Sequence, residues 1–537
     1  MKKTKKQKGL NKKIISILIY IIFISVFCFA IVPKALQNDT FYTIKIGELI
    51  KNNGIDMMDH FSWHEGLSYT YPHWLYDLIT YIIYAFFGME GIYIATCILS
   101  IILGNTIFFV NCKLNKNKII SFVVTIVAMY LLKSYIAARA QLVTFILFIL
   151  EIYFIEKFLE SRKSRYAVGL LIIPILIANL HLAVFPFYFV LYLPYIAEYM
   201  MKLISECILY PIKSNEEKLI RADNKIKEIK EKEKTKETEP YKVIVSKNKN
   251  VKYLIIIMII AALTGLLTPL GDTPYTYLIK TMQGNTTQSI NEHLPLTLIQ
   301  NVGILCALVI VIGMIAFTKL KIRLSDLFMI GGLIFLMFFS KRQETMFILI
   351  GSVIINRWIL YLLRGENKNL DIDKDHIIGI SIIFLMSIVV LFSYKEIKKV
   401  NKQSIVDESS YPVKACDYII DNINLDEARF YNEYNYGSYL LFRGIPVFID
   451  SRADLYAPEF SGKEEDIFTD FMKVSNIDVF YEDIFEKYNI THLIMYKNSK
   501  INMIIQNTKD ERYKELYSDK KFIIYERVSE NDDKNNS

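Results

Sequence analysis

The sequence predicts a multi-pass α-helical membrane protein that ends in an α/β domain outside the membrane. Three observations support this fold class. Of the 537 residues 53% are hydrophobic, and the mean hydropathy is +0.28, which is too apolar for an ordinary soluble enzyme. Long apolar runs recur through residues 14–394, and lysine-rich segments separate many of them. From residue 395 the pattern changes to short β-type runs that alternate with helical stretches.

The N-terminus predicts the orientation of the chain. Residues 1–13 are basic and precede Ile14–Val32, an uncharged run close to the roughly 20 residues that cross a bilayer. A cleaved signal peptide has an apolar region of about 7–15 residues and a small-residue cleavage site, and neither condition fits well here. We therefore expect a retained first helix with a cytoplasmic N-terminus, so that the loop 33–74 faces outward.

The positions of the basic residues predict how the remaining apolar runs cross the membrane. These runs are Leu75–Phe87, Gly91–Val110, Ile119–Leu132, Leu142–Ile155, Tyr166–Leu180, Leu182–Leu203, Tyr253–Leu270, Val302–Phe317, Leu327–Phe339, Met346–Leu363 and Ile377–Phe392. The basic connections that should be cytoplasmic are 113–118, 162–165, 206–250, 319–323 and 364–368. All of these connections lie on the cytoplasmic side only if residues 75–110 make one net crossing, with one half of that segment at the membrane interface. We expect about eleven crossings within residues 14–394, and an extracytoplasmic domain over residues 395–537.

Charge and cysteine content exclude several other interpretations. The net charge of +8 is explained by cytoplasmic lysines, so no nucleic-acid partner is expected. The loop 206–250 is a mixed-charge segment that predicts a partly helical or disordered cytoplasmic connection. The six cysteines are scattered and predict neither a disulfide framework nor a metal site.

The stretch Asp39–Trp74 concentrates reactive side chains in the first outer loop. Its glycine pattern predicts helix–turn–helix. Its acidic residues and histidines include Asp39, Asp56, Asp59, Glu65, His60, His64 and His73. A carboxylate-rich loop just outside a membrane span is well placed to act on something that arrives in the lipid. The His60 and His64 pair could hold a metal on one helical face, but such pairs often arise by chance, and we predict no metal ligands.

The expected topology brings further ionisable residues to the same outer side. These residues are Arg139, His181, Glu292 in the outer loop 271–300, and Arg342. Charged groups at the ends of membrane helices are costly, so they are candidates for function. Each arginine alone could instead extend its charge to the interface, and His181 could be an ordinary hydrogen-bonded histidine. Their convergence opposite the lysine-rich side favours function.

These segments resemble the GT-C superfamily of polytopic glycosyltransferases, and more closely its bacterial members similar to dolichyl-phosphate-mannose protein mannosyltransferases. The similar segments are Asp39 with IKIGELI, GIDMMDHFSW, PHWLYDLI, ARAQLVTF, ANLH, TPLG with INEHLP, SKRQETMF and NEYNYGSYLLFRGIPVFIDSRADLY. They span nearly the whole chain, although each is short and degenerate. The sequence departs from the pattern at Ala140, His293 and Ser451, which weakens any transfer of substrate contacts.

The resemblance implies transfer of a sugar from a polyprenyl-phosphate donor to an acceptor hydroxyl on a glycan, lipid or protein. It implies Asp39 as general base and Asp59 as a second carboxylate that positions the acceptor or the base. It implies Arg139 and Arg342 as cations for the leaving phosphate, with His181 and Glu292 as further substrate contacts. The bilayer is the second expected partner. No cofactor is required, and a divalent metal ion stays open because relatives differ in that need.

The C-terminal domain adds two further candidate site residues. Asp450 and Arg452 follow a predicted strand, so they either contact substrate or form an ion-pair network that holds this domain to the membrane module. No glycine-rich phosphate loop is present, which argues against nucleotide binding.

Three rival functions stay open for the whole chain. They are a transporter, a non-catalytic assembly or sensor protein, and an oligosaccharide transferase of the same superfamily. Asp39 could also merely cap a helix.

Overall fold

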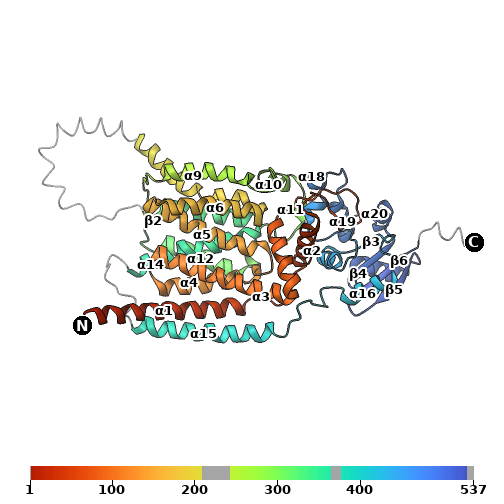
Figure 1. Cartoon of the computed structure of the whole chain (residues 1–537), viewed down its shortest axis with the longest axis horizontal. Coiled ribbons are helices and arrows are strands. Elements are labelled where there is room, and N and C mark those ends of the chain that lie inside the picture. Colours follow the sequence, from red (N-terminus) through yellow and green to blue (C-terminus); the bar gives the residue numbers. More distant parts are fainter. Residues whose placement is uncertain (1, 208–241, 365–375, 529–537) are drawn as a thin grey trace, which may run out of the picture.

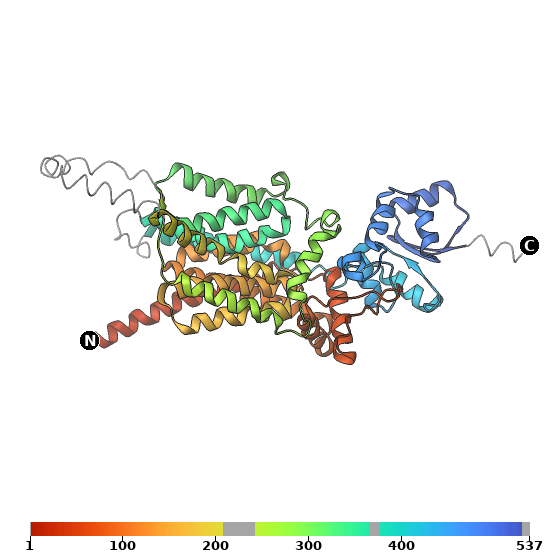
Figure 2. The same ribbon diagram turned by 90° about the horizontal axis from the view of Figure 1, so that it is seen from above.

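The computed structural model describes residues 2–207, 242–364 and 376–528, which form a helical bundle with an α/β domain at one end (Figure 1). The N-terminus lies at the opposite end of the bundle (Figure 2). The bundle helices are α1 (Lys2–Ala30), α3 (Trp74–Asn115), α4 (Lys118–Leu131), α5 (Ala140–Ser161), α6 (Ser164–Leu180), α7 (Phe185–Val190), a helix over 193–207, α9 (Val251–Leu263), α12 (Val302–Phe317), α13 (Leu324–Phe339), α14 (Glu344–Arg364) and α15 (His376–Val400).

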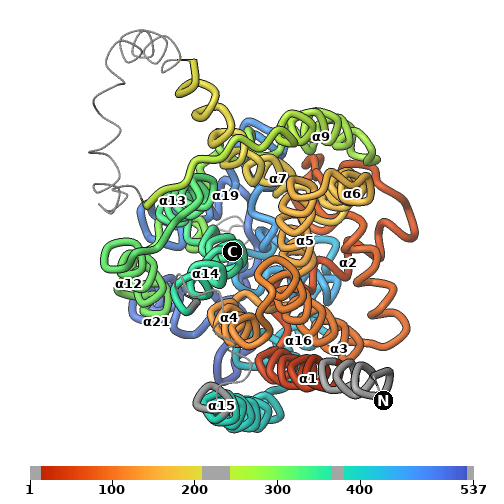
Figure 3. Tube along the Cα trace, turned by 90° about the vertical axis from the view of Figure 1, so that its left-hand side faces the viewer, coloured from red at the N-terminus to blue at the C-terminus, as the bar shows by residue number. Residues whose placement is uncertain are grey.

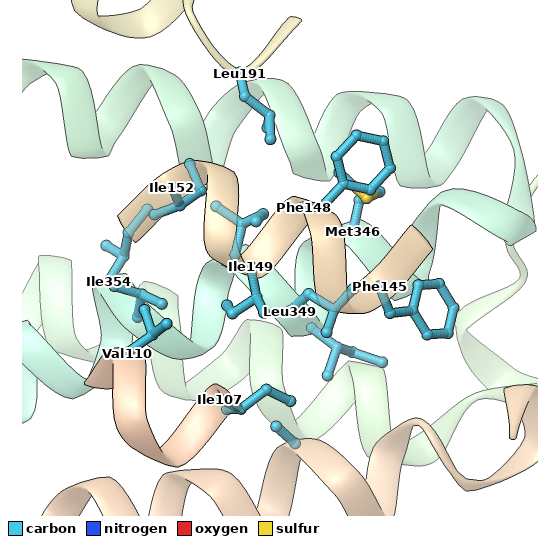
Figure 4. Packing of buried hydrophobic residues seen from close by; sticks show 14 of the residues in the cluster. Ile107, Val110, Phe145, Phe148, Ile149, Ile152, Leu191, Met346, Leu349 and Ile354 are labelled. Carbon is cyan, nitrogen blue, oxygen red and sulfur yellow. The ribbon is translucent and has the colours of Figure 1, made fainter. Parts of the chain in front are cut away.

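Apolar side chains fill the inside of the bundle and also cover much of its outside. Ile107 of α3, Phe148 and Ile149 of α5, and Leu349 of α14 pack at its centre (Figure 4). Figure 3 looks along the bundle and shows α1 beside α15, where Phe27 and Phe392 stack with ring centroids 5.5 Å apart. Apolar side chains such as those of α12 also face outward, as expected of helices surrounded by lipid.

Four helices among the described residues are long and apolar enough to cross a membrane. They are Trp74–Asn115, Leu182–Cys207, Lys341–Leu363 and Ile380–Val400. Further apolar helices of 10–17 residues, such as Ile14–Ala30 and Val302–Phe317, accompany them. A membrane location is therefore supported, whereas the count of about eleven crossings and the side on which each terminus lies remain predictions.

The predicted runs 75–87 and 91–110 form one helix, α3, with a kink. Gly88 has φ 64° and ψ −159°, a backbone conformation that glycine adopts readily. Before the kink α3 packs against α2 (Asn38–Asn53), and after it Ser100 donates a hydrogen bond to the backbone oxygen of Cys28 in α1. One half thus lies in the bundle and the other lies at its end, as a single net crossing by 75–110 would require.

The contact between α2 and α3 depends on Gly47. A β-carbon at this position would lie 2.1 Å from the backbone oxygen of Asp77 and 2.6 Å from Cβ of Tyr81. Gly47→Ala must therefore push the two helices apart, and we expect a loss of about 1–3 kcal/mol in unfolding free energy. Thermal unfolding in detergent tests this loss. Gly331→Ala in α13 is the control, because its β-carbon would meet no atom within 4 Å; an equal loss there would contradict the packing argument.

The first outer loop is not the predicted helix–turn–helix. Helix α2 ends at Asn53, and residues 54–73 are irregular up to the start of α3. They are held instead by the C-terminal domain, since the backbone nitrogen of Trp63 donates to the oxygen of Val447 at 3.3 Å. Without a helix, His60 and His64 share no helical face: His60 pairs with Asp56, and His64 bonds the oxygen of Phe448. The metal-binding alternative for this pair is therefore wrong in its geometry.

The C-terminal part contains a four-stranded sheet in the order β3-β4-β6-β5, surrounded by helices. Its strands are β3 (Phe430–Tyr431), β4 (His492–Tyr496), β5 (Tyr513–Ser518) and β6 (Phe522–Arg527), and only the β3–β4 pair is parallel. Its helices are α16 (Val413–Asn422), α17 (Tyr434–Phe442), α18 (Pro458–Ser461), α19 (Ile467–Asn476), α20 (Tyr481–Lys487) and α21 (Lys500–Thr508). The segment 446–451, predicted as a strand, makes only a single bridge from Val447 to Ser62 of the outer loop.

Short elements lie at the two ends of the bundle. Helices α10 (Thr273–Gln283) and α11 (Thr286–Ser289) lie next to the C-terminal domain (Figure 1). At the far end β1 (Val243–Ile244) pairs in parallel with β2 (Ile322–Arg323). The outer loops and the C-terminal domain therefore meet at one end, where they enclose the candidate site.

Candidate active site

A cavity of about 670 Å³ lies between the end of the bundle and the C-terminal domain. Its walls come from α2, from the segments that precede α3 and α5, from the loop 289–293 and from the C-terminal domain. The sequence-predicted residues that line it are Asp39, Arg139, His181, Glu292, Arg342 and Arg452. Asp59 and Asp450 do not line it. Residues more than 400 positions apart in the chain thus share one chamber.

Arg139 joins two carboxylates in this cavity. It precedes α5 and forms an ion pair with Asp39, while its Nη1 donates a hydrogen bond to Oε1 of Glu292 at 2.9 Å. Asp39 stands in the first turn of α2, where Gln37 is the N-cap and no side chain caps the helix. Helix capping is therefore not what Asp39 does.

Charges in the cavity decide the protonation of Arg139 and Glu292. Burial acts to lower the pKa of Arg139, yet the carboxylates of Asp39 and Glu292 hold that pKa above its ordinary value. Burial acts to raise the pKa of Glu292, and the positive charges of Arg139 and Arg342 outweigh it, so that this pKa is lowered. Both side chains are therefore charged at neutral pH, and the cavity presents fixed charges of both signs.

Arg342 supplies a second cation close to Glu292. Its backbone nitrogen donates to the backbone oxygen of Glu292 at 2.9 Å, and that of Lys341 donates to the oxygen of Leu294 at 2.8 Å. These bonds fix the loop 290–294 against the short helix that carries Arg342. Within the part of the chain that the structure describes, no ion pair engages the Arg342 guanidinium. Its charge is therefore available to an anionic ligand.

His181 follows α6 and is nearly fully buried at the cavity wall. Its Nδ1 lies 2.8 Å from Oγ1 of Thr144. Burial lowers the pKa of His181 well below its ordinary value, and the charge of Arg342 adds to that effect. The imidazole is therefore neutral and can serve as a hydrogen-bonding wall of the cavity, in contact either with substrate or with Thr144 alone.

Asp59, Arg452 and Asp450 form a buried ion-pair network. Nη1 of Arg452 lies 2.6 Å from Oδ1 of Asp59, and its Nη2 lies 2.7 Å from Oδ2 of Asp450. All three side chains are at most 2% exposed. The guanidinium also lies 5.5 Å and 5.1 Å from the ring centroids of Phe61 and Tyr69. Of the two alternatives for Asp450 and Arg452, this geometry favours the network that holds the domain to the outer loop.

Asp59, expected as a second carboxylate that positions the acceptor or the base, has both of its carboxylate oxygens engaged. Its Oδ2 accepts bonds from both the backbone nitrogen and the hydroxyl of Ser62, and its Oδ1 accepts from Arg452. Burial acts to raise the pKa of Asp59, but these partners hold it below its ordinary value. A carboxylate with both oxygens engaged and no surface in the cavity can only position other groups.

Several cavity residues were not predicted from the sequence. Tyr277 of α10 donates to Oδ2 of Asp454 at 2.5 Å, which ties the bundle end to the C-terminal domain. Burial raises the pKa of Glu433, also in the cavity wall, to about 7. Tyr42 and His73 line the cavity as well. His73 has one sequence signal that could have found it, since it lies four residues before Asp77 at a helix start.

Comparisons with known proteins bear on the fold. The structure is similar to the apo oligosaccharyltransferase of Archaeoglobus fulgidus, with a TM-score of 0.54 and 10% identity over 96% of this chain and 74% of that one. It is also similar to ArnT from Cupriavidus metallidurans bound to undecaprenyl phosphate, with a TM-score of 0.52 and 9% identity over 96% of this chain and 98% of that one. Both are GT-C glycosyltransferases. The chain has the GT-C fold.

The comparisons find the GT-C likeness in the solved structures only. No protein-family model matches the sequence, and no curated protein sequence matches it either. At 9–10% identity the two similar structures establish the arrangement of the chain and not its substrates. The chemistry of this chain must therefore be inferred from its own cavity.

Proposed function

We propose that the chain is a membrane glycosyltransferase that moves a sugar from a polyprenyl-phosphate donor to an acceptor hydroxyl on the outer face of the membrane. One observation carries the proposal. Asp39, Arg139, Glu292 and Arg342 come from four separate segments and meet in one cavity at the end of an apolar bundle. A donor with an apolar tail and an anionic head would be bound by these two parts of the molecule together.

The cavity offers the groups that this transfer needs. An acceptor hydroxyl must lose its proton as it attacks the anomeric carbon, and a carboxylate within hydrogen-bond distance can accept it. We assign this role to Asp39. The departing phosphate gains negative charge, which Arg139 and Arg342 can stabilise through charge-assisted hydrogen bonds. Phosphate leaves without full protonation, so the acid and base pair of glycoside hydrolases is not required.

The placement relative to the membrane agrees with this chemistry. ArnT, one of the two similar structures, is bound to undecaprenyl phosphate, which supports a polyprenyl-phosphate partner for this chain. With the N-terminus in the cytoplasm, the cavity and the C-terminal domain lie on the outer side. The acceptor remains a glycan, a lipid or a protein.

The residues present do not favour a metal ion between the carboxylates of the cavity. Asp39 and Glu292 are joined by the guanidinium of Arg139, which already supplies the cation between them. Among the described residues no group of three or more histidine, cysteine or acidic side chains is arranged to hold a metal. We therefore derive no step through a metal.

The anion-binding role of Arg342 gives a direct test of the proposal. Arg342→Gln should weaken binding of a polyprenyl phosphate about tenfold or more, because a hydrogen bond to a charged group contributes about 1.5–3 kcal/mol. Binding of a short-chain polyprenyl phosphate to the chain in detergent, followed by microscale thermophoresis, measures the change.

Lys341→Gln is the matched control for Arg342. It removes the same charge from the neighbouring position, and Lys341 is not part of the cavity wall. Its affinity should stay within about twofold of the wild type. Equal weakening by both variants would mean that net charge, and not the cavity, binds the lipid phosphate.

A further inference from the structure

His73 is held in a single orientation by Asp77. It precedes α3, and its Nδ1 lies 2.7 Å and 2.9 Å from the two carboxylate oxygens of Asp77. The Asp77 side chain is 0% exposed. An acidic partner at this distance accepts the Nδ1 proton, which leaves Nε2 as the acceptor nitrogen of the neutral ring. That nitrogen lies 3.2 Å from the hydroxyl of Tyr42.

The surrounding packing fixes this pair of side chains. The rings of Tyr42 and His73 are stacked at 30° with centroids 5.8 Å apart. Gly47 lets the backbone of α2 approach that of α3 at Asp77 itself. His73 is also the residue before the first turn of α3, yet its side chain makes no capping hydrogen bond to that helix. The side chain is therefore oriented for something other than helix capping.

Tyr42 connects this pair to the proposed base. Asp39 and Tyr42 are three residues apart on α2, hence on neighbouring positions of one helical face, and both line the cavity with His73. Burial raises the pKa of Tyr42 above its ordinary value, and among the charges around it that of Asp39 has the largest effect. Asp39, Tyr42, His73 and Asp77 thus run in series from the cavity into the protein. Hydrogen bonds join the last three residues, and Asp39 stands three residues before Tyr42 on the same helix.

We propose that His73, oriented by Asp77, is a second acid–base residue of this cavity and takes up the proton of the acceptor hydroxyl from Asp39 through Tyr42. The proposal rests on the proposed function. Asp39 should hold the proton only briefly. A neutral Asp39 no longer offers a negative charge to Arg139, which then keeps Glu292 as its remaining carboxylate partner. A protonated His73 would instead form an ion pair with the buried carboxylate of Asp77.

The atoms balance as follows. The acceptor O–H bond breaks and its proton moves to Asp39, while a C–O bond forms at the anomeric carbon. The bond from that carbon to the phosphate oxygen breaks, and its electron pair remains on the phosphate. Asp39 then gives its proton to the oxygen of Tyr42 as Tyr42 gives its own proton to Nε2 of His73. Water in the cavity accepts that proton after the product leaves.

Steady-state transfer with variants of this series tests the proposal. We expect His73→Gln to lower kcat about 100-fold with the KM for a polyprenyl-phosphate sugar unchanged. Tyr42→Phe keeps the stacked ring, removes only the hydroxyl and should lower kcat about tenfold. Added imidazole should restore part of the activity of His73→Ala, which a purely structural role would not allow.

The control is His60→Gln in the same outer loop. His60 pairs with Asp56 at the same spacing of four residues, at 2.6 Å, but both side chains are more than 40% exposed and neither lines the cavity. This variant should keep wild-type kcat.

The outcomes separate this proposal from the proposed function. If the wild type transfers sugar and Asp39→Asn does not, while His73→Gln stays within about twofold of wild type, the relay is wrong and the transferase stands. A His73→Ala variant that is slow, shows a raised KM and does not respond to imidazole would assign His73 a structural role. A wild type that transfers no sugar would overturn both proposals together.

Discussion

Asp39→Asn should abolish sugar transfer and leave the donor bound. Asparagine has nearly the same size but cannot accept the proton of the acceptor hydroxyl, so kcat should fall by about 10²–10⁴-fold. Loss of the negative charge also frees Arg139 from one of its two carboxylate partners. Affinity for the anionic donor should therefore stay the same or increase. Single-turnover transfer and equilibrium binding of one labelled donor measure the two effects separately.

The matched control for Asp39 lies on the same helix. Glu48 is also an acidic residue of α2 in an ion pair, with Lys45 at 2.5 Å, and it is not part of the cavity wall. Glu48→Gln should transfer sugar at the wild-type rate. Turnover by Asp39→Asn within about threefold of wild type would show that Asp39 is not the base.

Arg452→Met should separate the C-terminal domain from the outer loop. The substitution leaves the buried carboxylates of Asp59 and Asp450 without their shared cation, and removing one partner of a buried ion pair costs about 3–5 kcal/mol. Because Arg452 itself lines the cavity, transfer activity should be lost as well. Thermal unfolding and limited proteolysis between residues 54 and 73 measure the effect on the fold.

Arg443→Met provides the comparison for Arg452. Arg443 pairs with Asp417 at 2.7 Å on the surface of the same domain, where Asp417 is 56% exposed. An exposed pair of this kind contributes less than about 1 kcal/mol. A similar loss of stability in the two variants would mean that the buried Arg452 network stabilises the domain no more than an exposed ion pair does.

The sequence could predict what local pattern and charge determine. Apolar runs correspond to helices because each needs only its own residues, and the lysine distribution placed Asp39, Arg139, Glu292 and Arg342 at one end of the chain's bundle. The two runs on either side of Gly88 were expected as separate segments, and the structure joins them into one kinked helix. The likeness to GT-C glycosyltransferases is supported by the similar structures.

What the sequence could not predict depends on distant contacts. The loop 54–73 is irregular because the C-terminal domain supplies its hydrogen-bond partners. The segment 446–451 has a strand-like composition but faces Ser62 of that loop and not the sheet. The partner of Asp59, Arg452, lies 393 positions later in the chain, so the sequence could not show the ion pair between them. The spacing of residues in the sequence does not show these contacts between distant segments.

Transfer of label from radiolabelled polyprenyl-phosphate sugars by the purified chain in lipid nanodiscs is the first measurement to make. A glycosyltransferase should consume at least one donor and release polyprenyl phosphate in equal amount, and Asp39→Asn should stop both. A wild-type chain that neither binds nor consumes any donor of a panel with different sugars would not be such an enzyme. A non-catalytic assembly role would then explain the fold better.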